Sequence, residues 1–220
     1  LERVRGDVGA LSFAPPIVLC NAAHRELVEN GLAANGSTAS AIVLEPMARN
    51  TAAVAAIAAA VAEGIDHNAL VLLMPADHLV AKPDAFRAAI ECAAPFARER
   101  IVAFGITPDR PATGYGYIKC GAELTPGVFA IDSFHEKPNE AVAQTYLNEG
   151  GYAWNGGIFL FSPTVMLEEF AASADIRDTA LASLESAERR GREIHISAEA
   201  FAHVPSLPLD IAVMEKTQRG

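Results

Sequence analysis

Short apolar segments alternate with longer helical segments over the first half of the chain, and this alternation limits the fold more than any other feature of the sequence. Strands that are apolar on both faces are typical of parallel sheets covered by helices on both sides. The pattern predicts an α/β protein with a Rossmann-like fold, in which a mixed, mostly parallel sheet carries helices on both faces. The predicted strands cover residues 15–21, 41–46, 69–78 and 101–106, and the predicted helices cover residues 23–36, 50–64 and 82–100. We expect 69–78, the most apolar segment, to be the most buried strand.

The second half of the chain has a different pattern. Residues 107–121 are rich in proline and glycine, and apolar and polar residues then alternate over 128–138, as in an antiparallel strand with one exposed face. A helix is predicted over 140–149, a strand from Trp154, and a pair of amphipathic helices over 166–191. No repeat or low-complexity linker divides the chain, so residues 1–220 are interpreted as one domain.

Composition excludes several classes of function. The 220 residues include 27 acidic and 17 basic side chains, a net charge of -10, so the electrostatic basis for nonspecific nucleic-acid binding is lacking. No apolar run approaches the roughly 20 residues of a membrane-spanning helix. The charged start of the sequence is not a secretory signal. Three cysteines without a CxxC pair argue against zinc and favour a reducing compartment, so we expect a cytoplasmic protein without a membrane or nucleic-acid partner.

Asp77 follows the most apolar predicted strand, in the sequence LLMPADH. In open α/β sheets, ligands bind at the carboxyl ends of the strands. Magnesium usually takes one or two carboxylates together with phosphate oxygens, so Asp77 is placed to hold a metal beside a phosphate substrate. The alternative is that Asp77 caps the next turn, and this segment alone does not decide between the two interpretations.

The sequence LEPMARNTAA places Glu45 at the end of a strand and Asn50 and Thr51 at the start of a helix. A helix start offers unpaired N–H groups, while a carboxylate and an amide can read the donors and acceptors of a base. Glu45 is thus a candidate acceptor for a guanine amino group. Ordinary helix capping by Asn50 or Thr51 is the alternative.

Two further sequences suggest a sugar phosphate site. TGYGYI contains Gly116, where the backbone can approach a ligand closely, although glycine also simply makes turns. HEKP places Glu136 and Lys137 at a strand end, where a carboxylate can accept sugar hydroxyls and an ammonium group can offset phosphate charge. The alternative is an exposed ion pair, worth about 0–1 kcal/mol.

The sequence WNGGIFLF sets Asn155, Gly156 and Gly157 ahead of an apolar run. These residues pack poorly, which makes sense if the start of this strand faces a sugar: the glycines let the backbone approach, and the amide of Asn155 bonds two hydroxyls. A turn beside a core tryptophan, Trp154, is the alternative.

In this order, the sequences LEPMARNTAA, MPADH, FGITPDRPATGYGYI, HEKP, WNGGIFLF and DIAVMEKT closely resemble the mannose-1-phosphate guanylyltransferases, including the corresponding half of the bifunctional enzymes that also isomerise mannose 6-phosphate. The resemblance covers most of the chain, from about residue 16 to residue 217. It implies a Rossmann-like nucleotidyltransferase that forms GDP-mannose and pyrophosphate from GTP and mannose 1-phosphate with Mg²⁺, and it allows a homodimer.

The resemblance also implies a role for each candidate residue. Asp77 would hold Mg²⁺ and act in catalysis with Lys137, which would face the sugar phosphate. The guanine and ribose would lie against Glu45, Asn50 and Thr51. The mannose would be lined by Gly116, Glu136, Asn155 and Gly156.

The chain also departs from the family pattern. The glycine-rich GGxGTRLWPLSR sequence that supplies the phosphate cradle is absent, as is the WxDVG sequence that carries a second metal carboxylate. We therefore expect the domain of residues 1–220 to be incomplete at both ends relative to the family, and the loss of an opening strand to leave strand edges unpaired. Ile211 replaces the family's tyrosine, and Asp210 is interpreted as a helix cap.

Two other functions remain open on the sequence. One is a nucleotidyltransferase for another base and another hexose 1-phosphate, which Glu45 and the following RNT sequence disfavour. The other is a noncatalytic sugar-nucleotide-binding protein, which would bind ligand without turnover. An oxidoreductase is disfavoured because no GxGxxG sequence opens a helix.

Overall fold

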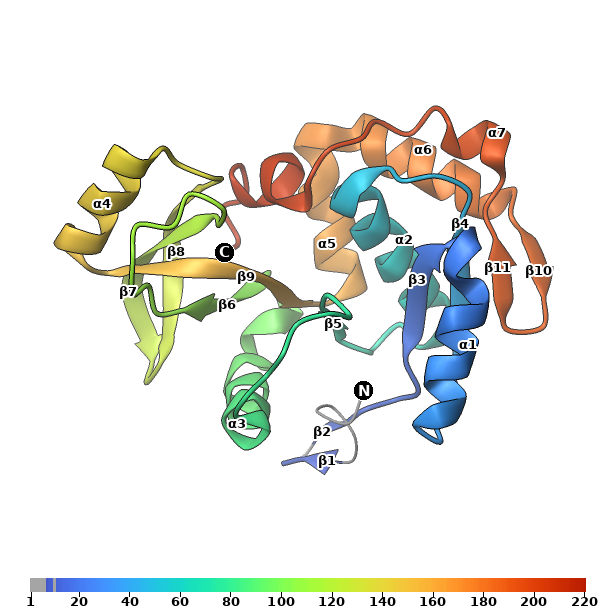
Figure 1. Ribbon diagram of the computed structural model, residues 1–220, viewed down its shortest axis with the longest axis horizontal. Helices are drawn as coiled ribbons and strands as arrows, with labels where there is room; N and C mark the ends of the chain where they lie inside the picture. The colour runs from blue at the N-terminus through green and yellow to red at the C-terminus, as the bar shows by residue number, and fades with distance from the viewer. Residues whose placement is uncertain (1–6, 10) are drawn as a thin grey trace.

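Figure 1 shows the computed structural model of the chain, which describes residues 7–9 and 11–220. Helices and strands alternate through most of this part of the chain, which confirms the predicted α/β class. The helices are α1 (Arg25–Ala34), α2 (Asn50–Ile65), α3 (Pro83–Ala93), α4 (Glu140–Glu149), α5 (Pro163–Glu169), α6 (Ala174–Glu185) and α7 (Ala198–Phe201), with 3₁₀ turns at Ala22–His24, Phe96–Arg98 and Phe170–Ser173 and a π-helix at Asp210–Met214.

One sheet has the strand order β10–β11–β4–β3 and lies on the right of Figure 1. β4 (Ala41–Glu45) is buried throughout and pairs in parallel with β3 (Ile17–Asn21) and β11 (Glu193–His195), while β10 (Glu188–Arg190) is antiparallel to β11. Alternate residues of β4 face opposite helices, since Ile42 packs in a cluster with α1 and Val43 in a cluster with α2. Helices therefore cover both faces of this sheet, as predicted.

A second sheet is organised around β9 (Tyr152–Phe161). One edge of β9 pairs with β7 (Tyr117–Thr125) and then with β5 (Val71–Leu73), and its other edge pairs with β6 (Val102–Ile106). β8 (Val128–His135) extends the sheet beyond β7, and all of these pairings are antiparallel. A small separate hairpin joins β1 (Asp7–Val8) and β2 (Leu11–Ser12).

The expected predominance of parallel pairing is wrong for the described residues. Only β4 pairs in parallel there, with β3 and with β11. Two physical reasons explain the difference. β7 and β8 are joined by a tight turn at Pro126 and Gly127, which makes adjacent strands antiparallel. β3 and β5 belong to separate sheets, so the two sets of strands do not form one continuous ladder in the described chain.

The segment predicted to be the most buried strand is another correction. Within residues 69–78, only Val71–Leu73 form a strand, and each of the three is partly exposed. β4, by contrast, is buried over its whole length. β5 has a strand neighbour on one edge only within the described residues, while β4 lies between two strands. The apolar composition of a strand alone does not predict whether it lies between two strands or has a neighbour on one edge only.

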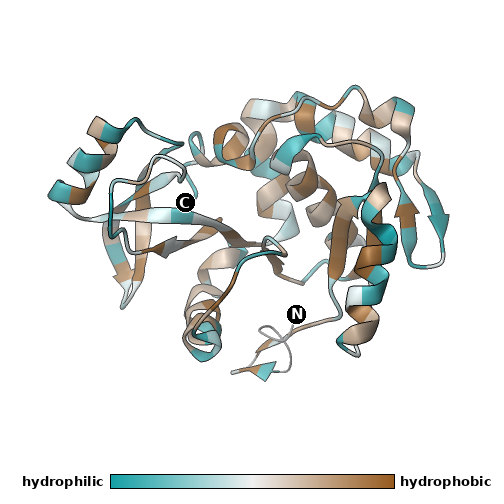
Figure 2. Ribbon diagram, in the orientation of Figure 1, coloured by the Kyte–Doolittle hydropathy of each residue, from teal (hydrophilic) through white to brown (hydrophobic). Residues whose placement is uncertain are grey.

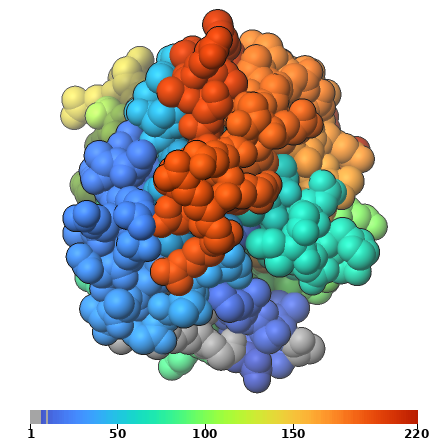
Figure 3. All heavy atoms as spheres, turned by 90° about the vertical axis from the view of Figure 1, so that its right-hand side faces the viewer, coloured from blue at the N-terminus to red at the C-terminus, as the bar shows by residue number. Residues whose placement is uncertain are grey.

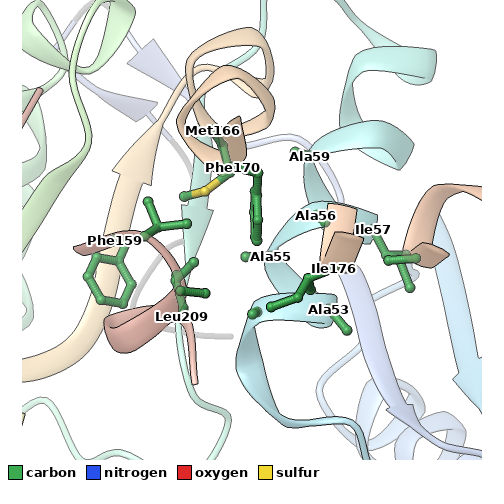
Figure 4. Close-up of a cluster of buried hydrophobic side chains, with 14 of the residues drawn as sticks. Ala53, Ala55, Ala56, Ile57, Ala59, Phe159, Met166, Phe170, Ile176 and Leu209 are labelled. Atoms are coloured by element: carbon green, nitrogen blue, oxygen red, sulfur yellow. The ribbon is translucent and has the colours of Figure 1, made fainter. Parts of the chain in front are cut away.

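Helix α2 forms the centre of the main core. Figure 2 shows its apolar character, and most of its buried residues are alanines. The short side chains let α2 pack against α5 and α6 as well as against both sheets. In Figure 4, Ala55, Ala56 and Ala59 lie among larger side chains such as Phe170 and Ile176. The alanine-rich sequence is thus what close packing between helices requires.

The β10–β11 hairpin was not predicted, since the residues of β10 were assigned to the end of a helix pair and those of β11 to no element. Figure 3 shows this segment, in orange, at the centre of one face of the molecule, beside α1 in blue. Arg25 of α1 contacts Glu193 of β11 at 2.6 Å, which ties the hairpin to that helix. Charged residues surround the turn at Gly191, so the apolar alternation by which strands are recognised is missing.

We predict that Ala56→Leu lowers the free energy of unfolding by about 1–3 kcal/mol, because the added atoms would overpack a fully buried position. Urea denaturation followed by circular dichroism measures the effect. Ala182→Leu, at an exposed position in α6, is the matched control and should change stability by less than about 0.5 kcal/mol. Equal stability of the two variants would contradict the proposed packing of α2.

Candidate active site

Strand β9 has a bulge at the residues that looked out of place in the sequence. Against β6, Phe159 is opposite Ala103 and Asn155 is opposite Gly105, so Gly156–Ile158 face the single residue Phe104. Gly157 has a φ of +66°, which only glycine adopts readily. On the other edge, β7 pairs up to Trp154 and β5 starts at Phe159. The unpaired stretch therefore lies in the middle of a long strand, not at its start as predicted, and bulges of this kind re-aim side chains beside active sites.

Asn155 is held by three hydrogen bonds at this bulge. Its backbone N–H donates to the carbonyl oxygen of Gly116 at 2.8 Å, its Oδ1 accepts from the N–H of Gly157 at 3.0 Å, and its Nδ2 donates to Oδ1 of Asp210 at 2.7 Å. The side chain is buried, with 8% exposure. One amide hydrogen and one lone pair of the amide oxygen remain beyond these bonds. The amide can therefore give one bond and accept one.

Glu136 and Gly116 lie in direct contact. A Cβ on Gly116 would be 2.9 Å from Oε2 of Glu136 and 3.1 Å from the ring of Phe134, so a larger residue would displace this carboxylate or the ring. Lys137 forms an ion pair with Glu136 at 2.9 Å and has a φ of +43°. The hydrogen bond from Lys137 to Glu136 raises the pKa of Lys137, and the lysine side chain itself remains exposed. The structure thus brings together Gly116, Glu136, Lys137 and Asn155, which belong to three separate sequences.

The single tryptophan fixes the loop ahead of Gly116. Tyr115 packs on Trp154 with ring centroids 5.0 Å apart, and the guanidinium of Arg110 lies 5.0 Å from the tryptophan ring centroid. Trp154 is buried, as the core interpretation expected. It also precedes Asn155, so this packing positions the loop and the bulge relative to each other.

Glu45 is a buried carboxyl group at the end of β4. Within the described residues, its Oε1 has no hydrogen-bond partner. Burial raises the pKa of Glu45 to about 7, from an ordinary value of 4.5. An unsatisfied buried acceptor is unfavourable for folding, which makes it a candidate for a ligand contact.

Asn50 and Thr51 are engaged in local contacts at the start of α2. Asn50 has a φ of +64°, and its Oδ1 accepts from the N–H of Thr51 at 2.9 Å. Oγ1 of Thr51 accepts from the N–H of Leu209 at 2.9 Å, which links the helix start to a distant segment. Both residues therefore have structural contacts, and the hydroxyl hydrogen of Thr51 can still be donated.

Asp77 is exposed in a bend beyond β5. Pro75, two residues before it, lies close to the bulge, since a Cβ on Gly157 would be 3.7 Å from Cγ of Pro75. The described residues contain no group of three or more His, Cys, Asp or Glu side chains arranged to hold a metal. One exposed carboxylate still fits Mg²⁺, which takes one or two carboxylates with water and phosphate oxygens as its other ligands.

Asp210 was missed as a site residue because it was interpreted as a helix cap. It is the first residue of the π-helix, whose cap position is occupied by Leu209, and no side chain forms a capping bond there. Its carboxylate instead accepts from Asn155, which is 55 positions away in the sequence. The sequence contains no signal for this contact beyond the residue type.

The chain matches the model of a known protein family. Residues 8–195 match the family model described as nucleotidyl transferase. This span includes most of the strands and every candidate residue except Asp210. The chain belongs to the nucleotidyl transferase family. Members of this family generally use a divalent metal ion.

Several individual nucleotidyl transferase relatives are similar over most of the chain. This chain is 45% identical over 211 residues to the alginate biosynthesis protein AlgA of Pseudomonas aeruginosa, with 93% of this chain and 44% of the relative covered. It is 40% identical over 211 residues to a mannose-1-phosphate guanylyltransferase of Escherichia coli, with 92% and 44% covered. The chain thus spans less than half the length of these curated relatives.

A solved structure described as mannose-1-phosphate geranyltransferase from Thermus thermophilus has the same fold. The TM-score is 0.76 at 31% identity, over 92% of this chain and 56% of that one. In the described part of this nucleotidyl transferase chain, no helix is long and apolar enough to cross a membrane.

We predict that Glu45→Gln becomes more stable than the wild type as pH rises. Between pH 4.5 and about 7, folded Glu45 keeps a proton that the unfolded chain has lost, so the wild-type free energy of unfolding falls as pH rises through this range. The difference should reach roughly 1–3 kcal/mol above pH 7. Urea denaturation from pH 5 to pH 8 measures it.

Glu26→Gln, at an exposed position in α1, is the matched control and should not show this trend. The comparison with wild type also cancels the titration of other groups, such as Asp210. A stability difference that stays constant across this pH range would contradict the raised pKa of Glu45.

Proposed function

We propose that this nucleotidyl transferase is a mannose-1-phosphate guanylyltransferase, which forms GDP-mannose and pyrophosphate from GTP and mannose 1-phosphate. The observation that carries the proposal is the convergence of Gly116, Glu136, Lys137 and Asn155 on the β9 bulge. These are the residues that the family resemblance assigns to the hexose phosphate. The names of the relatives support the same substrate class.

The hexose would lie against Asn155 and Glu136. Asn155 offers one donor and one acceptor, and the Glu136 carboxylate accepts hydroxyl hydrogens beside Gly116. The backbone at Gly156 has no side chain to hold a ligand away from the strand. A compact set of donors and acceptors of this kind suits a ring with several adjacent hydroxyl groups.

Transfer would follow in-line attack. An oxygen of the mannose 1-phosphate attacks the α-phosphorus of GTP, a new P–O bond forms, and the bond to the β-phosphate oxygen breaks so that pyrophosphate leaves. The exposed ammonium group of Lys137 would face the sugar phosphate and offset its charge. Asp77 would hold Mg²⁺, which supplies further neutralisation of phosphate charge when bound. The protein supplies position and charge instead of a covalent nucleophile.

The guanine would lie between the end of β4 and the start of α2. The unpaired Oε1 of Glu45 is an acceptor suited to the N–H groups of guanine, and binding would satisfy it. Asn50 and Thr51 would lie at the base and ribose. We also propose a cytoplasmic location, which the three free cysteines support.

Lys137→Ala in the full-length protein should lower kcat for pyrophosphate release from GTP and mannose 1-phosphate by about 10²–10³-fold, because one charged group at the reacting phosphates is lost. Lys119→Ala, which removes an exposed lysine ion-paired with Asp132, is the matched control and should retain wild-type kcat. A coupled pyrophosphate assay measures both variants.

The same assay distinguishes the proposed function from a nucleotidyltransferase for another base and from a noncatalytic binding protein. GTP should be used in preference to ATP, UTP and dTTP, because these bases lack the guanine amino group. Preference for another nucleotide would contradict the guanylyl assignment. Binding of GDP-mannose without pyrophosphate release, by a folded full-length protein, would instead show a noncatalytic binding protein.

A further inference from the structure

Among the described residues, Asp210 is the acidic residue whose side chain is hydrogen-bonded to the candidate hexose residue Asn155, and none of the roles proposed above includes it. Resting on the function proposed above, we propose that Asp210 is a positioning residue of the hexose phosphate site, which fixes the side-chain amide of Asn155 and joins it to the nucleotide side of the site. The geometry of one hydrogen-bonded segment carries this inference.

The partners of the Asn155 side-chain amide fix its orientation. An asparagine side chain can present its oxygen or its nitrogen in a given direction by turning over. Here Nδ2 donates to the Asp210 carboxylate at 2.7 Å, and Oδ1 accepts from the N–H of Gly157 at 3.0 Å. A carboxylate only accepts hydrogen bonds and a backbone N–H only donates them, so the reversed amide would face two mismatches. Asp210 therefore fixes which end of Asn155 offers a donor to the sugar.

Asp210 is itself anchored through the residues that precede it. The preceding Leu209 is almost fully buried, and Figure 4 shows its side chain within the main core beside Phe159 of β9. The backbone N–H of Leu209 donates to Oγ1 of Thr51, and the carbonyl oxygen of Leu207 accepts from the N–H of Ala52 at 3.1 Å. The segment 207–210 is thus fixed to the start of α2 at one end and to Asn155 at the other.

The surroundings of Asp210 disfavour an ionised carboxyl group. Burial, and then the negative charge of Glu136, raise the pKa of Asp210 to about 6, although the Asn155 hydrogen bond and the Lys137 charge act in the opposite direction. A carboxyl group in such surroundings destabilises the folded protein when ionised. Residues kept at the expense of stability are characteristic of functional sites. π-Helices, such as the one that Asp210 opens, are also frequent there.

A double-mutant cycle on the full-length protein tests the inference. Asp210→Ala should raise KM for mannose 1-phosphate about tenfold and leave KM for GTP within about twofold. Asp210→Asn should restore most of the loss, because its carbonyl oxygen can still accept from Asn155. In an Asn155→Ala background, adding Asp210→Ala should change KM for mannose 1-phosphate by less than about twofold, since there is no amide left to position.

Asp175→Ala, which removes an exposed acid from the first turn of α6, is the matched control and should match the wild type. Circular dichroism reports folding of each variant, and calorimetric titration reports its binding of GDP-mannose. If Asp210→Ala does not fold, Asp210→Asn still decides, because a tenfold loss in this isosteric variant would overturn the positioning role.

Other outcomes are also decisive. If the effects of Asp210→Ala and Asn155→Ala on KM for mannose 1-phosphate are additive, or if Asp210→Ala changes both KM values equally, the positioning role is wrong. Turnover by the wild-type protein would still support the proposed function in that case. A folded wild-type protein that neither releases pyrophosphate nor binds GDP-mannose would overturn both.

Discussion

The structure depends on one irregular strand. β9 pairs with β5, β6 and β7 and so holds the second sheet together, yet its ladder is interrupted at Gly156–Ile158. The interruption needs the positive φ of Gly157 and the absence of side chains at two successive glycines. Because the regular parts of β9 on both sides of the bulge pair with neighbouring strands, the bulge is held in place by the sheet. A rigid sheet thus presents Asn155 at a fixed position, which is what a binding site requires.

Several features of the site are unfavourable for folding and are offset by packing elsewhere. Glu45 and Asp210 are largely buried carboxyl groups with raised pKa values, and Asn50 and Lys137 have positive φ angles. The core around α2, where alanines admit the helix between larger side chains, supplies the compensating burial. The segment 207–210 connects these two parts of the molecule, because Leu209 belongs to the core and the next residue belongs to the site.

Much of the fold was predictable from local patterns. The positions of β3, β4, α2 and α4 follow from apolar runs and helix signals, and all four were predicted within a few residues. What could not be predicted depends on partners distant in sequence. The bulge is defined by the register of β9 against β6, the exposure of β5 by its place in the sheet, and the role of Asp210 by a contact with Asn155. The β10–β11 hairpin was missed because its charged residues resemble an exposed helix end.

The proposed function depends most on the β9 bulge forming the hexose side of a GDP-mannose site. A crystal structure of the full-length protein with GDP-mannose and Mg²⁺ tests it most directly. We expect mannose hydroxyls to contact the free donor and acceptor of Asn155 and the carboxylate of Glu136, with the guanine at Glu45. A sugar bound elsewhere, with Asn155 and Glu136 making only the contacts described above, would contradict it.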